Sequence, residues 1–117
     1  MPALMISRCD HPGSAVLTVV GEIDICTAPE LRASLQQVPL TDLVLDLSAV
    51  GFLSMAGLHH IVETHHRLRA ADHRFVVVES SPVRRLTRLS GLWAHDPPLH
   101  TVPARPGSPA RDLLPGR

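Results

Sequence analysis

The segment 43–58, LVLDLSAVGFLSMAGL, constrains the fold of this chain more than any other part of it. Its first five residues, Leu43 to Leu47, are mostly branched and apolar, which is typical of a strand buried on both faces of a sheet. A glycine-containing loop follows, and Ser54 is placed as the N-cap of a helix predicted over 57–70. Free backbone N–H groups and the helix dipole at such a corner favour an anion or a phosphorylated side chain.

Apolar patterns and turn residues predict the elements around this central strand. Strands are predicted over 3–9, 15–20, 74–78 and 99–102, and 21–24 is predicted to be a loop. A first helix is expected to stop at Pro39, and a third to begin with Ser81 as its cap. The resulting order, β-β-α-β-α-β-α, predicts an α/β fold with one mixed sheet of four to five strands and about three to four helices on its faces.

The start of the first helix carries a capping-box pattern, Thr27-Ala28-Pro29-Glu30. In such a box the hydroxyl of Thr27 accepts a hydrogen bond from the N–H of residue 30, and the side chain of Glu30 bonds back to the cap. The pattern therefore predicts that Thr27 caps this helix through its side chain.

The length of 117 residues fits a single domain. We expect that domain to occupy residues 1–102. From residue 103 onward proline, glycine, serine and arginine dominate, so 103–117 is predicted to be a disordered tail.

Composition excludes several classes of function. The formal net charge is zero, whereas nucleic-acid binders usually carry a strong basic excess. No apolar run approaches the roughly 20 residues that span a bilayer. Two cysteines, Cys9 and Cys26, without an apparent signal peptide indicate reduced thiols and a cytoplasmic location.

No pattern in the sequence predicts catalysis, a cofactor or a metal site. A nucleophile elbow, a phosphate-binding loop and a zinc motif are all missing. His59, Glu63 and His66 share one helical face, but polar residues at this spacing usually form a solvated face rather than a set of metal ligands.

Three stretches together resemble the STAS domain of the anti-sigma-factor antagonists. They are VVGEIDICTAPELR (19–32), LVLDLSAVGFLSMAGL (43–58) and RFVVVESSPVRRLTRLSGL (74–92), and the resemblance covers roughly residues 10–102. It implies a bacterial partner-switching protein that binds a kinase-type anti-sigma factor with a GHKL ATPase fold. In the family the kinase phosphorylates one serine at the start of the second helix, and the added charge of about −2 breaks the complex.

This chain departs from the family pattern at that serine. The family typically has Asp-Ser-Ser-Gly-Leu, where this chain has Ser54-Met55-Ala56-Gly57-Leu58. Alignment through Gly57 places Ala56, which has no hydroxyl, at the phosphoacceptor position, and Ser54 at the position of the acidic residue. The partner-binding residues implied by the resemblance are the following: Asp24, Ser54, Met55, Ala56, Gly57, Leu58 and His59.

Three interpretations of this departure stay open. The protein is a constitutive antagonist, or it has moved its regulation to Ser54 or another hydroxyl, or it has left sigma control for a scaffold, ligand-sensing or transporter-accessory role. In the last case its partners are other STAS proteins or a transporter. A monomer or a weak homodimer is expected.

Overall fold

The computed structural model describes residues 4–91, 99–105 and 110–113. Five strands form one sheet in the order β1-β2-β3-β4-β5, with β1 (Met5–His11) antiparallel to β2 (Ser14–Ile23). The strands β3 (Asp42–Leu53), β4 (Phe75–Glu79) and β5 (His100–Pro103) each lie parallel to the strand before them. The predicted mixed sheet, with the segment from residue 43 in its central strand, is therefore confirmed.

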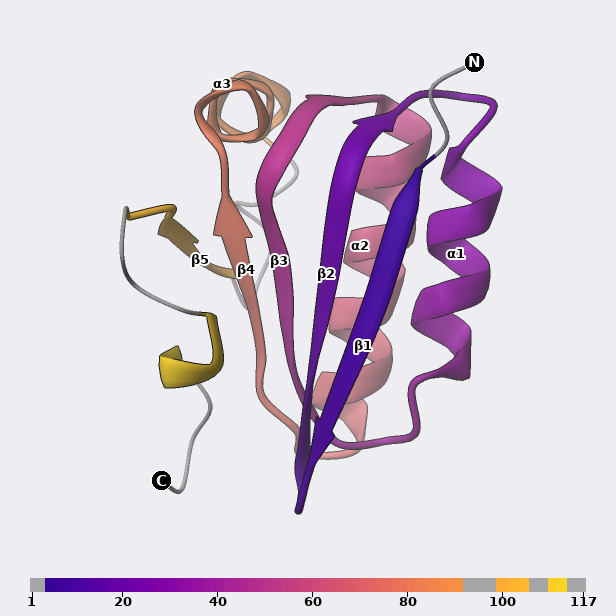
Figure 1. Cartoon of the computed structure of the whole chain (residues 1–117), viewed down its shortest axis with the longest axis vertical. Helices are drawn as coiled ribbons and strands as arrows, with labels where there is room; N and C mark the ends of the chain where they lie inside the picture. The colour runs from indigo at the N-terminus through magenta and orange to yellow at the C-terminus, as the bar shows by residue number, and fades with distance from the viewer. Residues whose placement is uncertain (1–3, 92–98, 106–109, 114–117) are drawn as a thin grey trace.

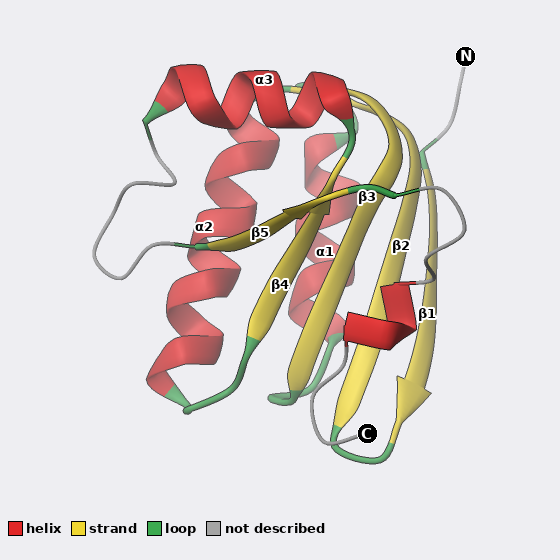
Figure 2. Cartoon of the chain, turned by 90° about the vertical axis from the view of Figure 1, so that its left-hand side faces the viewer, coloured by secondary structure: helices red, strands yellow, loops and turns green. Residues whose placement is uncertain are grey.

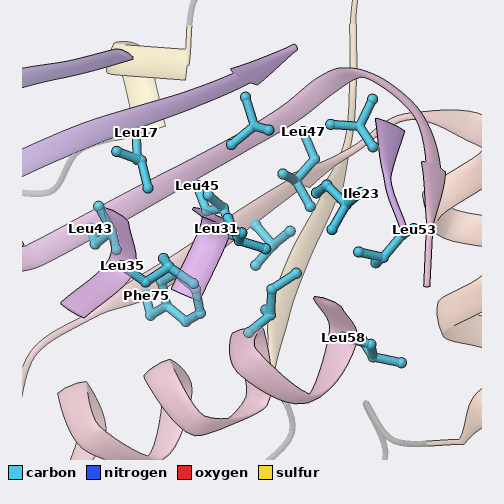
Figure 3. Close-up of a cluster of buried hydrophobic side chains, with 14 of the residues drawn as sticks. Leu17, Ile23, Leu31, Leu35, Leu43, Leu45, Leu47, Leu53, Leu58 and Phe75 are labelled. Atoms are coloured by element: carbon cyan, nitrogen blue, oxygen red, sulfur yellow. The ribbon is translucent and has the colours of Figure 1, made fainter. Parts of the chain in front are cut away.

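The connection from β2 to β3 contains α1 (Ala28–Gln37), and the connection from β3 to β4 contains α2 (Met55–Ala70). Both helices lie on the same face of the sheet (Figure 1). The main core lies between these helices and the strands and is built almost entirely from aliphatic side chains (Figure 3). Ile23, Leu45 and Leu58 are among its fully buried members. A third helix, α3 (Ser81–Ser90), lies across one end of the sheet (Figure 2).

The opposite face of the sheet carries a second, smaller apolar cluster. Four valines form it: Val16, Val44, Val76 and Val78. The short 3-10 helix η2 (Ala110–Leu113) lies over this face, and Ala110 packs against the cluster (Figure 2). Thus η2 falls inside the segment predicted to be a disordered tail, and Pro103 belongs to β5. The rest of that segment after Arg105 lies outside the described residues, and so does the start of the strand predicted from residue 3.

Two predicted loops are strands in the structure. β2 continues through 21–23 and β3 through 48–53, because the parallel pairing resumes after irregularities, with Glu22 opposite Phe52 and Ile23 opposite Leu53. Glycine weakens a strand and often marks a bulge, so Gly21 and Gly51 gave the appearance of loops. The β2–α1 loop and the β3–α2 corner therefore both start from strands that are still paired with each other.

The starts of two helices also differ from prediction. α2 begins at Met55 rather than residue 57, directly after the predicted cap at Ser54. α3 is capped by Ser80 rather than Ser81, because the buried hydroxyl of Ser80 donates to the carbonyl of Val50 at 2.6 Å and accepts from the N–H of Val83 at 3.4 Å. Ser80 and Ser81 are equally suitable caps on sequence alone. The hydrogen bond from Ser80 to Val50 in β3 decides which of the two caps the helix.

Candidate functional site

The corner between β3 and α2 is held by hydrogen bonds of the side chain and the backbone of Ser54. Its side-chain Oγ accepts a hydrogen bond from the N–H of Gly57 at 3.2 Å, which confirms its role as the N-cap of α2. Its backbone N–H donates to the carbonyl of Ile23 at 2.7 Å, which ties the corner to the end of β2. The hydroxyl of Ser54 therefore already has a structural role.

Gly57 and Leu58 face inward, although both were predicted to contact a partner. Leu58 is fully buried. A Cβ atom on Gly57 would lie 2.5 Å from Cγ2 of Ile23 and 2.8 Å from Cδ1 of Leu53, so only glycine lets the first turn of α2 approach the strand ends this closely. Both residues therefore pack against the interior and do not form part of the surface of the corner.

Met55, Ala56 and His59 form the outer side of the first turns of α2. The side chains of Met55 and His59 are exposed, and Ala56 is half-buried with part of its surface against the core. The N–H groups in the first turn of an α-helix have no carbonyl partner four residues earlier. A phosphate on a side chain at position 56 would thus meet the positive end of the helix dipole, but Ala56 offers no atom to carry it.

Asp24 organises the neighbouring loop between β2 and α1. Its Oδ1 accepts hydrogen bonds from the backbone N–H groups of Thr27 and Cys26, both at 2.9 Å. The bond from the Thr27 N–H, with those from Cys26 and the Thr27 hydroxyl, holds the pKa of the Asp24 carboxyl below its ordinary value. The carboxylate of Asp24 thus shapes the loop, and its contact with a partner stays a prediction.

The predicted capping box at Thr27 is wrong. Thr27 precedes α1, but its side chain makes no capping bond to the helix. Its hydroxyl instead donates to the carbonyl of Glu22 at 2.8 Å and accepts from the N–H of Asp24 at 2.9 Å. Since these bonds within the loop occupy the hydroxyl, it does not turn toward the N–H of Glu30, which donates to the backbone carbonyl of Thr27 at 2.9 Å.

Two exposed apolar side chains at this end of the molecule were missed by sequence reasoning. Ile25 is 77% exposed and Phe52 is 49% exposed, and Met55 is 47% exposed. The β2–α1 loop, which carries Ile25, and the β3–α2 corner lie at the same end of the sheet (Figure 1). We call Ile25, Phe52 and Met55 the corner patch. The strand alternation of Phe52 with the buried Leu53 was the available signal, but it was hidden by the prediction of a loop.

The polar face of α2 next to the corner is solvated. His59, Glu63 and His66 are all exposed. Glu63 pairs with His60 at 3.1 Å instead, and the hydrogen bond from His60 lowers the pKa of the Glu63 carboxyl. Within the described ranges there is no group of three or more His, Cys, Asp or Glu side chains placed to hold a metal ion. Nor is any helix in that part of the chain long and apolar enough to cross a membrane.

Comparisons with known proteins agree on one family. The STAS domain profile matches residues 7–99. The anti-sigma-F factor antagonist RsfB of Mycobacterium tuberculosis is 38% identical over 93 residues, which cover 77% of this chain and 76% of that protein. The crystal structure of an anti-sigma factor antagonist from Mycobacterium paratuberculosis has a TM-score of 0.75 and 36% identity, covering 87% of each chain.

A more distant structure shows the same fold. The anti-sigma factor antagonist SpoIIAA in its unphosphorylated form superimposes with a TM-score of 0.67 at 19% identity, covering 89% of this chain and 90% of that one. Together, the profile match over most of the sheet and helices and the similarity to the mycobacterial proteins show that this chain belongs to the STAS domain family.

Proposed function

We propose that this chain is an anti-sigma-factor antagonist that binds a kinase-type anti-sigma factor by partner switching and so regulates transcription. It acts as a binding protein rather than an enzyme, and it works in the cytoplasm. The similarity to the mycobacterial antagonists over most of both chains is the observation that carries this proposal. The alternative roles, as a scaffold, a ligand-sensing module or a transporter accessory, have no comparable support.

The binding surface in this proposal is the corner patch together with the outer side of the first turns of α2. Exposed apolar residues of this kind commonly mark protein-interaction sites when they gather at one place. Met55 suits such a surface because its side chain adapts to the shape of a partner. The loop shaped by Asp24 presents Ile25 to the same partner.

We further propose that the kinase does not switch this antagonist off at the usual position, because Ala56 stands there. Ser54 is a poor replacement, since its Oγ accepts the N–H of Gly57 and its backbone is bonded to β2. Phosphoryl transfer needs a nucleophile in line with the transferred group, and a hydroxyl two residues away is displaced from that line. The protein is therefore a constitutive antagonist.

A binding measurement tests the proposed surface. The partner kinase is first captured from the native host with the tagged chain and then purified. We expect Met55→Asp to weaken its affinity for that kinase by about tenfold or more, because a charge would be desolvated in an apolar contact. Leu40→Asp is the matched control, since Leu40 is 55% exposed but lies in the α1–β3 connection. Equal affinities for the two variants would reject the corner patch as the interface, and capture of STAS proteins or a transporter instead of a kinase would reject the antagonist role.

A phosphorylation assay tests the switch. Incubation of the chain with the captured kinase and ATP is expected to leave residues 54–58 unmodified. Ala56→Ser is expected to become phosphorylated at residue 56 and then to lose affinity for the kinase. Phosphopeptide mapping that finds phosphate on Ser54 of the unaltered chain would contradict the constitutive role.

A further inference from the structure

A hollow of about 310 Å³ lies far from the corner, where the end of α2 meets the starts of β4 and β5. It is lined by six residues: His65, Arg69, His73, Arg74, Phe75 and His100. His65 and Arg69 come from α2, His73 and Arg74 from the turn that follows it, and Phe75 and His100 are the first residues of β4 and β5. Five of the six side chains are cationic or become cationic on protonation.

The two arginines of this hollow are available to a ligand. Both side chains are exposed, and neither forms an ion pair with any residue that the structure describes. An acidic group beside them, Asp42, accepts a hydrogen bond from the backbone N–H of Arg74 at 2.8 Å and pairs with His73 at 3.4 Å. The carboxylate of Asp42 is thus already bonded to two residues that line the hollow. Since the whole chain has no net charge, this concentration of positive groups is local.

We propose that this hollow binds a small phosphate-bearing anion of the diphosphate class. A guanidinium group offers a planar fork of N–H donors that matches phosphate oxygens, and two such groups at one hollow favour a ligand with more than one charge. A volume of about 310 Å³ lies at the small end of the range for ligand pockets, which favours a compact ligand.

The hollow is independent of the proposed partner-binding surface. Arg69 follows Met55 by fourteen positions in α2, which corresponds to about 21 Å along a helix that rises 1.5 Å per residue. A small anion can therefore occupy the hollow while a protein covers the corner patch. This inference does not depend on the antagonist role and can fail or hold separately from it.

Isothermal titration calorimetry with inorganic pyrophosphate, at low ionic strength and pH 7, tests the proposal. We expect saturable binding of one pyrophosphate, and a loss of affinity of about tenfold or more in both Arg69→Gln and Arg74→Gln, because each removes charge-assisted hydrogen bonds. Arg85→Gln is the matched control, since Arg85 is an exposed arginine on α3. Affinity within twofold of the unaltered chain is expected for the control. Circular dichroism checks that all three variants are folded, as expected for changes at exposed side chains.

Three results would overturn the proposal. They are the absence of saturable binding, unchanged affinity in both hollow variants, and an equal loss in the Arg85 control, which would indicate general charge attraction. Met55→Asp must leave pyrophosphate binding unchanged, because the corner is remote; a loss there would also count against this hollow.

Discussion

Gly57 shows how one residue sets the position of a helix. The two contacts that a Cβ atom would make, with Ile23 and Leu53, both fall below 3.0 Å. Ile23 is fully buried and branched at Cβ, so it has little room to move aside. The side chain missing at position 57 thus lets α2 approach the ends of β2 and β3 and keeps the corner compact.

Gly57→Ala is therefore expected to destabilise the domain by about 1 kcal/mol. Overpacking costs roughly 1–3 kcal/mol, and the better helix propensity of alanine returns at most about 1 kcal/mol. The free energy of unfolding in urea measures the change. Gly51→Ala is the control, since a Cβ at Gly51 would meet no atom within 4 Å. A Gly57→Ala variant as stable as the Gly51→Ala variant would contradict the close-packing argument.

Asp24 makes the stability of its loop depend on pH. The pKa of its carboxyl is lowered in the folded state, mainly by the bond from the Thr27 N–H. A group with a lowered folded pKa stabilises the protein above its unfolded pKa, near 4, and this contribution is lost as the pH falls through the folded value.

We expect Asp24→Asn to be less stable than the unaltered chain at pH 6, and the difference to shrink as the pH falls below about 4. Urea unfolding at several pH values measures it. Glu22→Gln, which changes a nearby exposed carboxylate, should show no such trend. A difference between Asp24→Asn and the unaltered chain that is constant from pH 6 to pH 2.5 would argue against the role of this carboxylate.

At the level of elements, the serine caps of α2 and α3 make different sets of hydrogen bonds. Ser54 caps α2 with a single side-chain bond, to the N–H of Gly57. Ser80 caps α3 and also donates to the carbonyl of Val50, so it joins the helix to the central strand. The second serine is buried, which makes its lost hydrogen bonds harder for water to replace.

Ser80→Ala is accordingly expected to cost about 2 kcal/mol and Ser54→Ala about 1 kcal/mol. The comparison uses urea unfolding curves of the two variants. Ser81→Ala serves as control, because Ser81 is exposed at the first position of α3, and it should cost little. If Ser54→Ala proved the more damaging of the two cap variants, the link between α3 and β3 would have been overestimated.

The sequence predicted which elements exist because its apolar periodicity is strong. Every predicted strand and helix is present within the described residues, and the face of α1 with Ala28, Leu31 and Leu35 is buried as expected. The extents of β2 and β3 were not predictable, because pairing with a neighbouring strand overrides the local preference of Gly21 and Gly51 for loops. The choice of Ser80 as cap likewise depends on Val50, which is distant in sequence.

At the scale of the whole molecule, the sequence predicted that two segments of the candidate site lie together, but not which of their apolar side chains are exposed. The corner at Ser54 and the loop at Asp24 lie at one end of the sheet, as the family resemblance implied (Figure 1). Helical spacing puts Leu58 on one face of α2 with Ile61 and Leu68, and all three are buried. The exposure of Ile25 and Phe52 could not be predicted until the sheet and helices were assembled, because the exposure of an apolar side chain depends on which surfaces pack around it.

The two faces of the sheet are covered very differently, and this leads to a prediction. Helices cover one face, whereas η2 lies over the valine cluster of the other. Ala110→Asp would place a charge against that cluster, so we expect η2 to detach and the dye ANS to bind the uncovered valines with increased fluorescence. Leu113→Asp is the control, because Leu113 is already exposed. Equal ANS fluorescence from the two variants would show that η2 does not shield this face.

The separation between the cap at Ser54 and the half-buried position 56 has an evolutionary consequence. The helix start depends on the hydroxyl of Ser54 and on the missing side chain of Gly57, so a serine at position 56 would leave both in place. Every alanine codon differs from one serine codon by a single nucleotide. Under the proposed function, a lineage with this fold can therefore gain or lose a regulated state in one mutational step without passing through an unstable intermediate, and antagonists of both kinds can arise repeatedly from a common ancestor.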